Sequence, residues 1–229
     1  MALQLRFTLP EKLYLRDPQE TKYGRKLLQK TIDLLSNIGF EAFTFRKLGK
    51  EMSSSEVSIY RYFENKHLLL LYLNCWYWEW VHHLIDRSVL NMQDPKAKLD
   101  KALHSIIYAS KESDLTHYIN EQKLHRIVLN ESSKSYHIHD VDAENRDGLF
   151  LPYKNLVEKL STIILEVNPK CKYPRSLSST IFEMTNNQVY YAEHLPRLTD
   201  LKGSKNIYAD LEKMISFFAY GVIHAQEQN

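Results

Sequence analysis

The stretch from Thr44 to Lys66, TFRKLGKEMSSSEVSIYRYFENK, decides the fold of this chain. In its first half, Phe45, Leu48 and Met52 fall at positions i, i+3 and i+7. This spacing places the three side chains on one face of a helix of about two turns. Thr44 precedes them, and a threonine hydroxyl can cap the first turn of a helix. The sequence therefore predicts a short amphipathic helix that begins at Phe45.

The second half of the stretch predicts a turn and another short helix. The serines at 53–55 interrupt the apolar pattern, because serine side chains compete for backbone hydrogen bonds and favour turns and caps. Ser55 is a candidate N-cap with Glu56 beside it, and Ile59 and Phe63 are spaced to face inward. Asn65 can cap a further helix that begins near Lys66. Two short helices joined by a tight turn are the layout of a DNA-reading helix-turn-helix.

Two short helices bury little area alone, and the preceding residues supply a third helix. Apolar residues recur there with a helical period at Leu27, Leu28, Ile32, Leu35 and Ile38. Gly39 follows directly and is a candidate C-cap. Residues of about 20 to 66 are therefore expected to form a three-helix unit.

With these motifs in view, the chain resembles the TetR family of bacterial transcriptional regulators. The resemblance rests on Gly39-Phe40, on Thr44-Phe45-Arg46-Lys47-Leu48-Gly49, on Ser58-Ile59-Tyr60-Arg61-Tyr62-Phe63 and on Lys66, and it covers roughly residues 21 to 72. It implies a homodimer that binds a palindromic operator in double-stranded DNA. It also implies an all-helical ligand-binding domain, and release of the operator when a small-molecule effector binds there.

The resemblance also assigns roles to individual residues. The implied DNA contacts are Thr44, Arg46, Ser55, Glu56, Val57, Ser58, Tyr60, Arg61 and Lys66. Thr44, Arg46, Tyr60 and Lys66 would contact phosphates, and residues 55–58 would face base edges in the major groove. Arg61 would reach either a phosphate or a guanine edge.

Three positions depart from the family pattern. Ser53 stands where a glycine is usual, and it is expected to adopt a left-handed conformation at some cost. Ser54 stands where an aliphatic residue is usual. Glu56 stands where a small or basic residue is common, and it either accepts a bond from cytosine N4 or only complements the helix dipole. Tyr62, next to the contact residues, either faces the DNA or packs on the helix surface.

Composition sets outer bounds on the class of protein. The chain has 229 residues, of which 44% are hydrophobic, so a globular protein of one or two domains is expected. Residues 1–68 carry a net charge of +4 and the remainder −2, which is compatible with an operator-binding head. Cys75 and Cys171 form no metal or disulfide motif, which fits a reducing cytoplasm. No signal peptide or membrane-spanning run is expected.

The pattern along the chain predicts an all-α protein with three parts. These are an N-terminal arm at 1–20, the helix-turn-helix domain at 21–66, and a helical ligand-binding and dimerisation domain at 67–229. The arm is expected to pack against the body, with insertion into a minor groove as the alternative. Further helices are expected at about 66–91, 95–111, 115–130, 149–167, 175–194 and 204–226, with polar loops or helix ends at 131–147.

The larger domain offers candidate dimer and effector residues. By resemblance the last two helices would pair with their copy through Ile181, Met184, Tyr191, Leu211, Ile215, Phe218 and Val222. The same residues are equally compatible with the core of one protomer. Trp76, Trp80 and His83 lie at near-helical spacing and are candidates for an effector pocket, with an aromatic core stripe as the alternative.

Enzymatic and metal functions have little support in the sequence. His137, His139 and Asp140 alternate in a polar segment and raise the question of a metal ligand set, but we expect no metal there. No nucleophile motif, phosphate loop or paired carboxylates stand out, so we expect no cofactor and no enzyme. Two hypotheses remain: a ligand-responsive repressor, and a helical interaction or ligand-binding protein that keeps the fold but reads no DNA.

Overall fold

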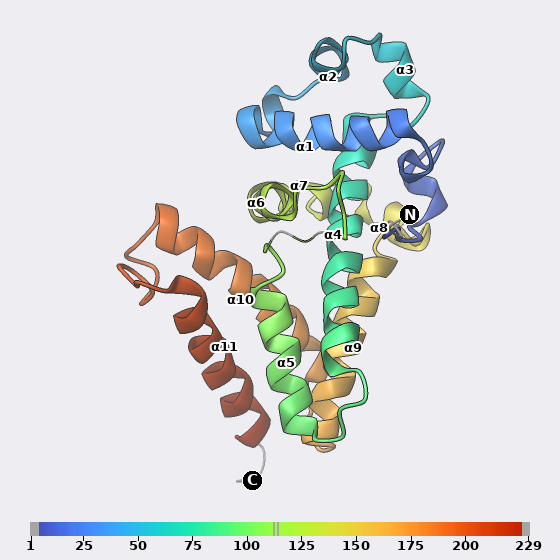
Figure 1. Cartoon of the computed structure of the whole chain (residues 1–229). Coiled ribbons are helices and arrows are strands. Elements are labelled where there is room, and N and C mark those ends of the chain that lie inside the picture. The colour runs from blue at the N-terminus through green and yellow to red at the C-terminus, as the bar shows by residue number, and fades with distance from the viewer. Residues whose placement is uncertain (1–4, 112, 114, 226–229) are drawn as a thin grey trace. The chain divides into compact units, whose positions relative to one another are not determined.

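The computed structural model describes residues 5–111, 113 and 115–225, and every regular element in those ranges is a helix (Figure 1). This confirms the all-α prediction. Two 3-10 turns, η1 Glu11–Leu13 and η2 Pro18–Glu20, precede the α-helices. The helices are α1 Lys22–Ala42, α2 Phe45–Met52, α3 Glu56–Tyr60, α4 Lys66–Val89, α5 Pro95–Ile107, α6 Glu121–Glu131, α7 Ser133–Tyr136, α8 Val141–Arg146, α9 Leu151–Val167, α10 Pro174–His194 and α11 Ile207–His224.

The chain divides into two compact units. The first unit combines Met1–Glu79 with Ser110–Pro152, and the second combines Trp80–Ala109 with Tyr153–Asn229. Helix α4 contributes to both units, and it is apolar on more than one face as the sequence predicts. The predicted domain boundaries after residues 20 and 66 stay a prediction, because a division into compact units does not define functional domains.

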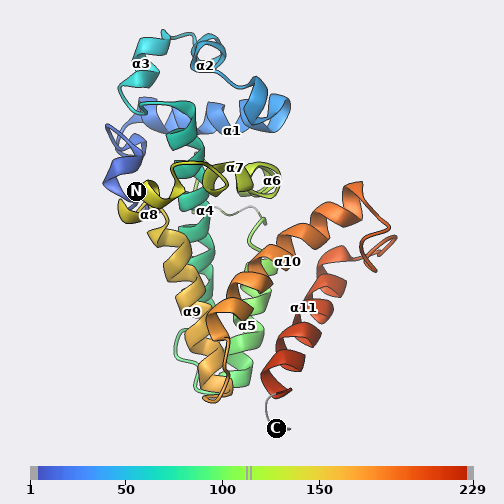
Figure 2. The same cartoon turned by 180° about the vertical axis from the view of Figure 1, so that it is seen from behind.

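Three helices of the first unit form the expected head. Helix α2 and helix α3 lie on one side of α1, and α6 lies on the other side (Figures 1 and 2). The capping predictions for α2 and α4 are confirmed: Thr44 Oγ1 accepts a hydrogen bond from the N–H of Lys47, and Asn65 Oδ1 accepts one from the N–H of Leu68. Gly39 has φ 70° and breaks the helical conformation of α1 three residues before its end.

The segment that completes the first unit differs from the sequence prediction. Helix α6 begins at Glu121 and not near 115, because Asn120 is extended and its side chain caps α6 by accepting from the N–H of Lys123. The polar segment after α6 contains the short helices α7 and α8 where only loops or helix ends were expected. These helices are too short for a helical period to be recognised in the sequence.

The N-terminal arm packs against the rest of the first unit over its described residues, as expected from the sequence. Leu9 and Leu13 are at most 3% exposed, and Gln19 is 1% exposed. Residues 1–4, also part of the expected arm, lie outside the described ranges. An arm held in this way does not extend freely toward a minor groove.

The second unit is held by apolar packing and by a few polar links. Helix α11 packs against α10 and α5. Lys98 of α5 donates to Glu166 of α9 at 2.6 Å, and Tyr220 of α11 donates to Asp100 of α5 at 2.8 Å. In the described ranges, no helix is long and apolar enough to cross a membrane.

Candidate nucleic-acid interface

The helix-turn-helix rests on a closed apolar layer. Phe45, Leu48 and Met52 of α2 are at most 5% exposed, and Ile59 and Phe63 are fully buried. This is the inward face that the spacing predicts. The opposite face of α2 and α3 is therefore left open to solvent and available to a partner.

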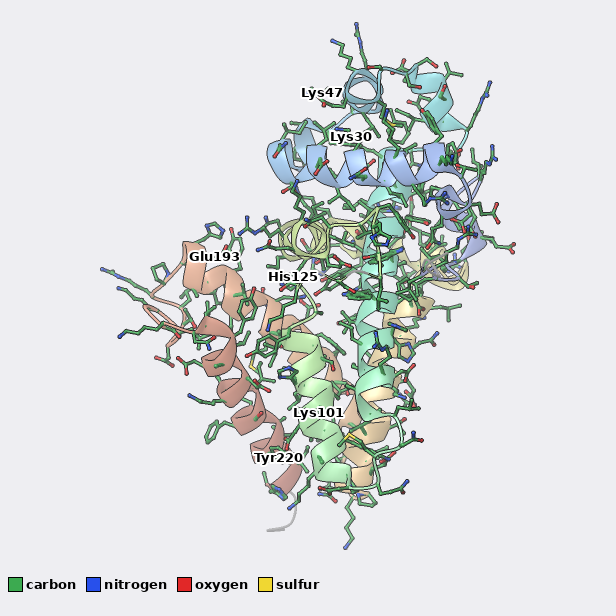
Figure 3. All side chains as sticks on the ribbon, in the orientation of Figure 1. Lys30, Lys47, Lys101, His125, Glu193 and Tyr220 are labelled. Carbon is green, nitrogen blue, oxygen red and sulfur yellow. The ribbon has the colours of Figure 1, made fainter. Side chains whose placement is uncertain are left out.

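Polar and cationic side chains occupy this open face. Those of Thr44, Arg46, Ser55, Glu56, Val57, Tyr60 and Arg61 are exposed, and that of Ser58 is half-buried. Lys47 and Lys50, which the sequence prediction left out, are also exposed on α2 (Lys47 is labelled in Figure 3). Val57 is 62% exposed and Tyr60 is 48% exposed, so two large side chains face solvent on α3. The surface offers positive charge, hydroxyls and an apolar contact, which are the groups that read DNA.

The turn between α2 and α3 is tight. Ser53 has φ 52° and ψ 45°, so the predicted left-handed conformation is confirmed. The N–H of Ser54 donates to the carbonyl of Gly49 at 2.8 Å, and a Cβ on Gly49 would lie 2.8 Å from the carbonyl oxygen of Ser54. Only glycine fits there without a backbone shift. The turn thus fixes the angle at which α3 leaves α2.

Ser54, which departs from the family pattern, has a partner on α1. Its hydroxyl lies 2.9 Å from the hydroxyl of Tyr23. A polar residue at this position is therefore accommodated by a polar neighbour. Sequence reasoning missed Tyr23, because a tyrosine in the first turn of a helix gives no sign of its partner.

The predicted side-chain cap of α3 is wrong in one detail. Ser55 stands at the N-cap position, but its side chain makes no capping hydrogen bond. Its hydroxyl lies 3.1 Å from that of Ser58 instead. The hydroxyls of Ser55 and Ser58 therefore form a pair on the face that the resemblance assigns to base edges.

Lys66 is engaged within the head. Its Nζ donates to the carbonyls of Phe40 and Phe43 at 3.1 and 3.4 Å and lies 4.5 Å from the centroid of the Phe40 ring. It is half-buried. Lys66 therefore connects the start of α4 to the end of α1. The phosphate contact that the resemblance implies for Lys66 stays a prediction.

The structure decides between the two interpretations of Tyr62 and leaves both interpretations of Glu56 open. Tyr62 is 5% exposed, stacks on Tyr23 with ring centroids 5.7 Å apart, and shares a hydrogen bond of 2.8 Å with Thr21. Packing is therefore its role. Glu56 is exposed in the first turn of α3, where both the dipole and the cytosine interpretation stay open.

The predicted effector residues fall in both units. Trp76, in the first unit, is fully buried and meets Phe7 edge-on at 5.1 Å. In the second unit, Trp80 is 1% exposed and its Nε1 donates to the carbonyl of Ala109, while His83 stacks on Trp80. Burial lowers the pKa of His83. Both tryptophans thus serve as core side chains, and their contact with an effector stays a prediction.

A polar pocket lies elsewhere, beside α1 and the start of α6. Its volume is about 460 Å³, and Asp33, His117, Glu121 and Lys123 are among its lining residues. Lys123 and Asp33 form an ion pair of 2.5 Å at this pocket. None of the three predicted effector residues lines it.

The predicted dimer residues separate into two groups. Ile181, Leu211 and Ile215 are fully buried within the protomer and belong to its core. Met184 and Tyr191 are half-buried, whereas Phe218 and Val222 are 47% and 39% exposed. Phe217, which the sequence prediction left out, is 75% exposed on the same helix.

The histidine segment shows no metal site. His139 is fully exposed and pairs only with its neighbour Asp140, at 2.9 Å, which raises the pKa of His139. His137 meets the ring of Tyr136 edge-on. Within the described ranges, no group of three His, Cys, Asp or Glu side chains is placed to hold a metal ion.

Comparison with known proteins agrees with this geometry. Residues 27–73 match the family model described as bacterial regulatory proteins, tetR family. No curated protein matches the chain in sequence. The match spans α1 from Leu27, the whole of α2 and α3, and the start of α4.

Several solved structures share the fold. The complex of AibR with isovaleryl coenzyme A and operator DNA has TM-score 0.55 and 14% identity, over 88% of this chain and 97% of AibR. A TetR-family transcriptional regulator from Bordetella parapertussis 12822 has TM-score 0.57 and 13% identity, over 86% and 95%. The superantigen PfiT has TM-score 0.56 and 16% identity, over 92% and 97%. At such low identities these likenesses establish the fold alone.

Together, an all-helical fold and an exposed helix-turn-helix define the class of helical DNA-binding regulators. Residues 27–73 are similar to the TetR family of bacterial regulatory proteins, and the whole chain shares the fold of a solved TetR-family regulator.

Proposed function

We propose that this chain is a ligand-responsive transcriptional repressor that works in the cytoplasm as a homodimer on a palindromic operator. The observation that carries the proposal is the open face of α2 and α3. Arg46, Lys47, Lys50 and Arg61 are exposed there beside Val57 and Tyr60, over a fully packed apolar layer. A surface that keeps large side chains exposed over a rigid base suits a partner that is bound by shape and charge.

The proposed roles of the residues follow the way in which other helix-turn-helix proteins dock on DNA. Thr44, Arg46 and Tyr60 contact phosphates, residues 55–58 face the base edges, and Arg61 binds a phosphate or a guanine. Val57 suits a thymine methyl group, because it is an exposed aliphatic side chain in the first turn of α3. Lys66 contributes by positioning the end of α1 and, as a further proposal, by contacting a phosphate.

Dimerisation is proposed through α10 and α11. Phe217, Phe218 and Val222 form the exposed apolar part of α11, with Met184 and Tyr191 half-buried on α10. Pairing of these surfaces would place two heads on successive major grooves, about 34 Å apart. An effector would then act by favouring a head spacing that no longer matches the operator.

The first experiment is selection of randomised duplex DNA by the purified chain at about 150 mM salt, where non-specific phosphate binding is weakened. The proposal expects an enriched palindrome. Arg46→Ala and Arg61→Ala are expected to weaken its binding by about 1–3 kcal/mol each. Arg126→Ala is the matched control, because Arg126 is exposed on α6 away from α2 and α3.

The alternative is a protein that keeps the fold and reads no DNA. It expects no enriched sequence from a folded protein and no difference among the three arginine variants. Lys66→Ala is unsuitable for this comparison, because it also removes the hydrogen bonds to Phe40 and Phe43.

Effectors can be sought by thermal shift and by release of the selected operator. AibR is crystallised with isovaleryl coenzyme A, so acyl coenzyme A thioesters belong in the panel beside aromatic compounds. A compound that stabilises the chain and releases the operator supports the proposal. A compound that stabilises the operator complex would instead indicate a co-repressor.

A further inference from the structure

The N-terminal arm is closed on itself by one buried side chain. The amide of Gln19 accepts from the N–H of Phe7 at 3.1 Å and donates to the carbonyl of Phe7 at 2.8 Å. Gln19 Oε1 also accepts from the hydroxyl of Tyr118 at 3.2 Å. A buried amide with these partners is costly to rearrange, so the described arm has a defined conformation.

One stretch of the arm contacts Tyr62, in the turn that follows α3. The N–H of Leu15 donates to the carbonyl of Tyr62 at 2.8 Å. The guanidinium of Arg16 lies 5.7 Å from the centroid of the Tyr62 ring. Thr21, where the arm ends, shares the hydrogen bond with the Tyr62 hydroxyl. The end of α3 is thus fixed from three sides by residues that precede α1.

Other parts of the same arm are tied to α4. Phe7 meets Trp76 edge-on at 5.1 Å, and Tyr14 meets Tyr72 edge-on at 5.9 Å. The Tyr72 hydroxyl donates to Asp17 at 3.3 Å. All of these residues lie in the first unit. The arm therefore connects the end of α3 to two successive turns of α4.

We propose that residues 5–21 are a brace that positions α3, and that the Leu15–Tyr62 hydrogen bond is its contact with the turn that directly follows α3. The helix has only five residues, Glu56–Tyr60, and two short helices bury too little area to fix their own orientation. The backbone bond from Leu15 supplies an external restraint at the point where α3 ends. The inference rests on the proposed function, since its consequence is tighter operator binding.

A matched pair of variants isolates this hydrogen bond. Leu15 is 66% exposed, so its side chain contributes little packing. Leu15→Pro removes the N–H, and Leu15→Ala keeps it. Tyr14 precedes it in an extended conformation, φ −147° and ψ 154°, which a following proline favours. The two variants therefore differ in the backbone donor at residue 15 and in the φ angle that proline fixes there.

We expect Leu15→Pro to weaken binding of the selected operator about five- to tenfold relative to Leu15→Ala, as loss of one hydrogen bond of about 1 kcal/mol predicts. Amide exchange of residues 58–63 should be faster in the proline variant, while exchange in α6 is unchanged. Equal affinity and equal exchange in the two variants would overturn the brace.

Two further measurements keep the result interpretable. If Leu15→Pro fails to fold, Arg16→Met tests the brace instead, because methionine keeps the alkyl stem and removes only the charge over Tyr62. Amide exchange at residues 58–63 as slow as in the parent chain would then count against the brace. If the parent chain selects no DNA, the proposed function fails, and the exchange comparison still measures whether the arm restrains α3.

Discussion

The carboxylate of Glu131 accepts a hydrogen bond of 3.0 Å from the backbone N–H of Phe40. Glu131 ends α6, and Phe40 directly follows Gly39, where the helical conformation of α1 is broken. The second carboxylate oxygen of Glu131 lies 2.8 Å from Nζ of Lys134. Helix α6 therefore supplies the partner for an N–H that the break in α1 leaves without an intrahelical acceptor.

Glu131→Ala should destabilise the chain by about 1–3 kcal/mol, because the buried N–H of Phe40 would lose its acceptor. Glu131→Gln should recover most of the loss, since its amide oxygen can accept the same bond. Urea denaturation measures both. Glu41 is the other partner of Lys134, and the Glu41 side chain is 80% exposed. Glu41→Ala should therefore cost at most a few tenths of the stability that Glu131→Ala loses. Equal losses for Gln and Ala would show that the charge matters more than the hydrogen bond.

Gly49→Ala should destabilise the head by about 1–3 kcal/mol, because its Cβ would meet the carbonyl oxygen of Ser54 at 2.8 Å. Gly221→Ala is the matched control. It lies inside α11 with no atom of the same protomer within 4 Å of the added Cβ, so the protomer itself should gain about 0.5–1 kcal/mol. Thermal unfolding at one fixed protein concentration compares them. A destabilisation shared by both variants would contradict the steric argument.

Ser53→Gly should stabilise the chain by about 0.5–1 kcal/mol. A non-glycine residue in the left-handed region costs about 1–2 kcal/mol, and the greater freedom of glycine in the unfolded chain offsets part of the gain. Ser53→Ala retains the strain and should give no gain. Denaturant midpoints distinguish the two variants, and a stabilising alanine would refute the backbone explanation.

His125 should make the stability depend on pH. It is buried on α6 on the opposite side of α1 from Lys47 (Figure 3), with Nδ1 2.5 Å from the hydroxyl of Tyr77. Burial lowers the pKa of His125 from 6.5 to about 4. Between these values the unfolded chain binds a proton that the folded chain does not bind. Stability should therefore fall as pH drops from 6.5 to 4, by about 3 kcal/mol in total.

Denaturation measured across that pH range checks the prediction. His125→Gln cannot titrate and should show a flatter dependence. His139→Gln is the control, because His139 is fully exposed and its pKa is shifted in the opposite direction. An unchanged slope in His125→Gln would assign the effect to other groups.

Phe218→Glu should shift a dimer toward monomers, because it would bury a carboxylate in the proposed interface. Analytical ultracentrifugation measures the shift in the dissociation constant, with at least a tenfold weakening expected. Leu90→Glu is the control, since Leu90 is 70% exposed in the turn after α4. Equal behaviour of the two variants would place the interface elsewhere.

The head could be predicted from the sequence because its signals are local. The spacing of Phe45, Leu48 and Met52, the left-handed Ser53 and the Asn65 cap each depend on a few neighbouring residues, and each is confirmed. Local signals also carried the family resemblance, which falls in the same stretch.

Features that depend on distant residues could not be predicted. Periodicity placed Ile181, Leu211 and Ile215 on an apolar face, but it does not say whether that face meets the same chain or a second copy. The hydrogen bonds of Lys66 to the carbonyls of Phe40 and Phe43 also have no sign in the local sequence. The sequence places the start of α6 too early, because the five residues at 115–119 contain no glycine or proline that would mark a break before Asn120.

The discontinuity of the first unit limits how freely its head can be moved between proteins. The chain leaves this unit after Glu79, returns at Ser110 and leaves it again after Pro152. Glu131 and Tyr118 come from the returning segment, yet they hold α1 and the arm. A chimera cut at residue 66 or 79 would separate the head from the supports that Glu131 and Tyr118 supply. Exchange of specificity between relatives should therefore succeed by substituting the exposed side chains of α2 and α3. Transfer of the whole head should fail unless residues 110–152 are transferred with it.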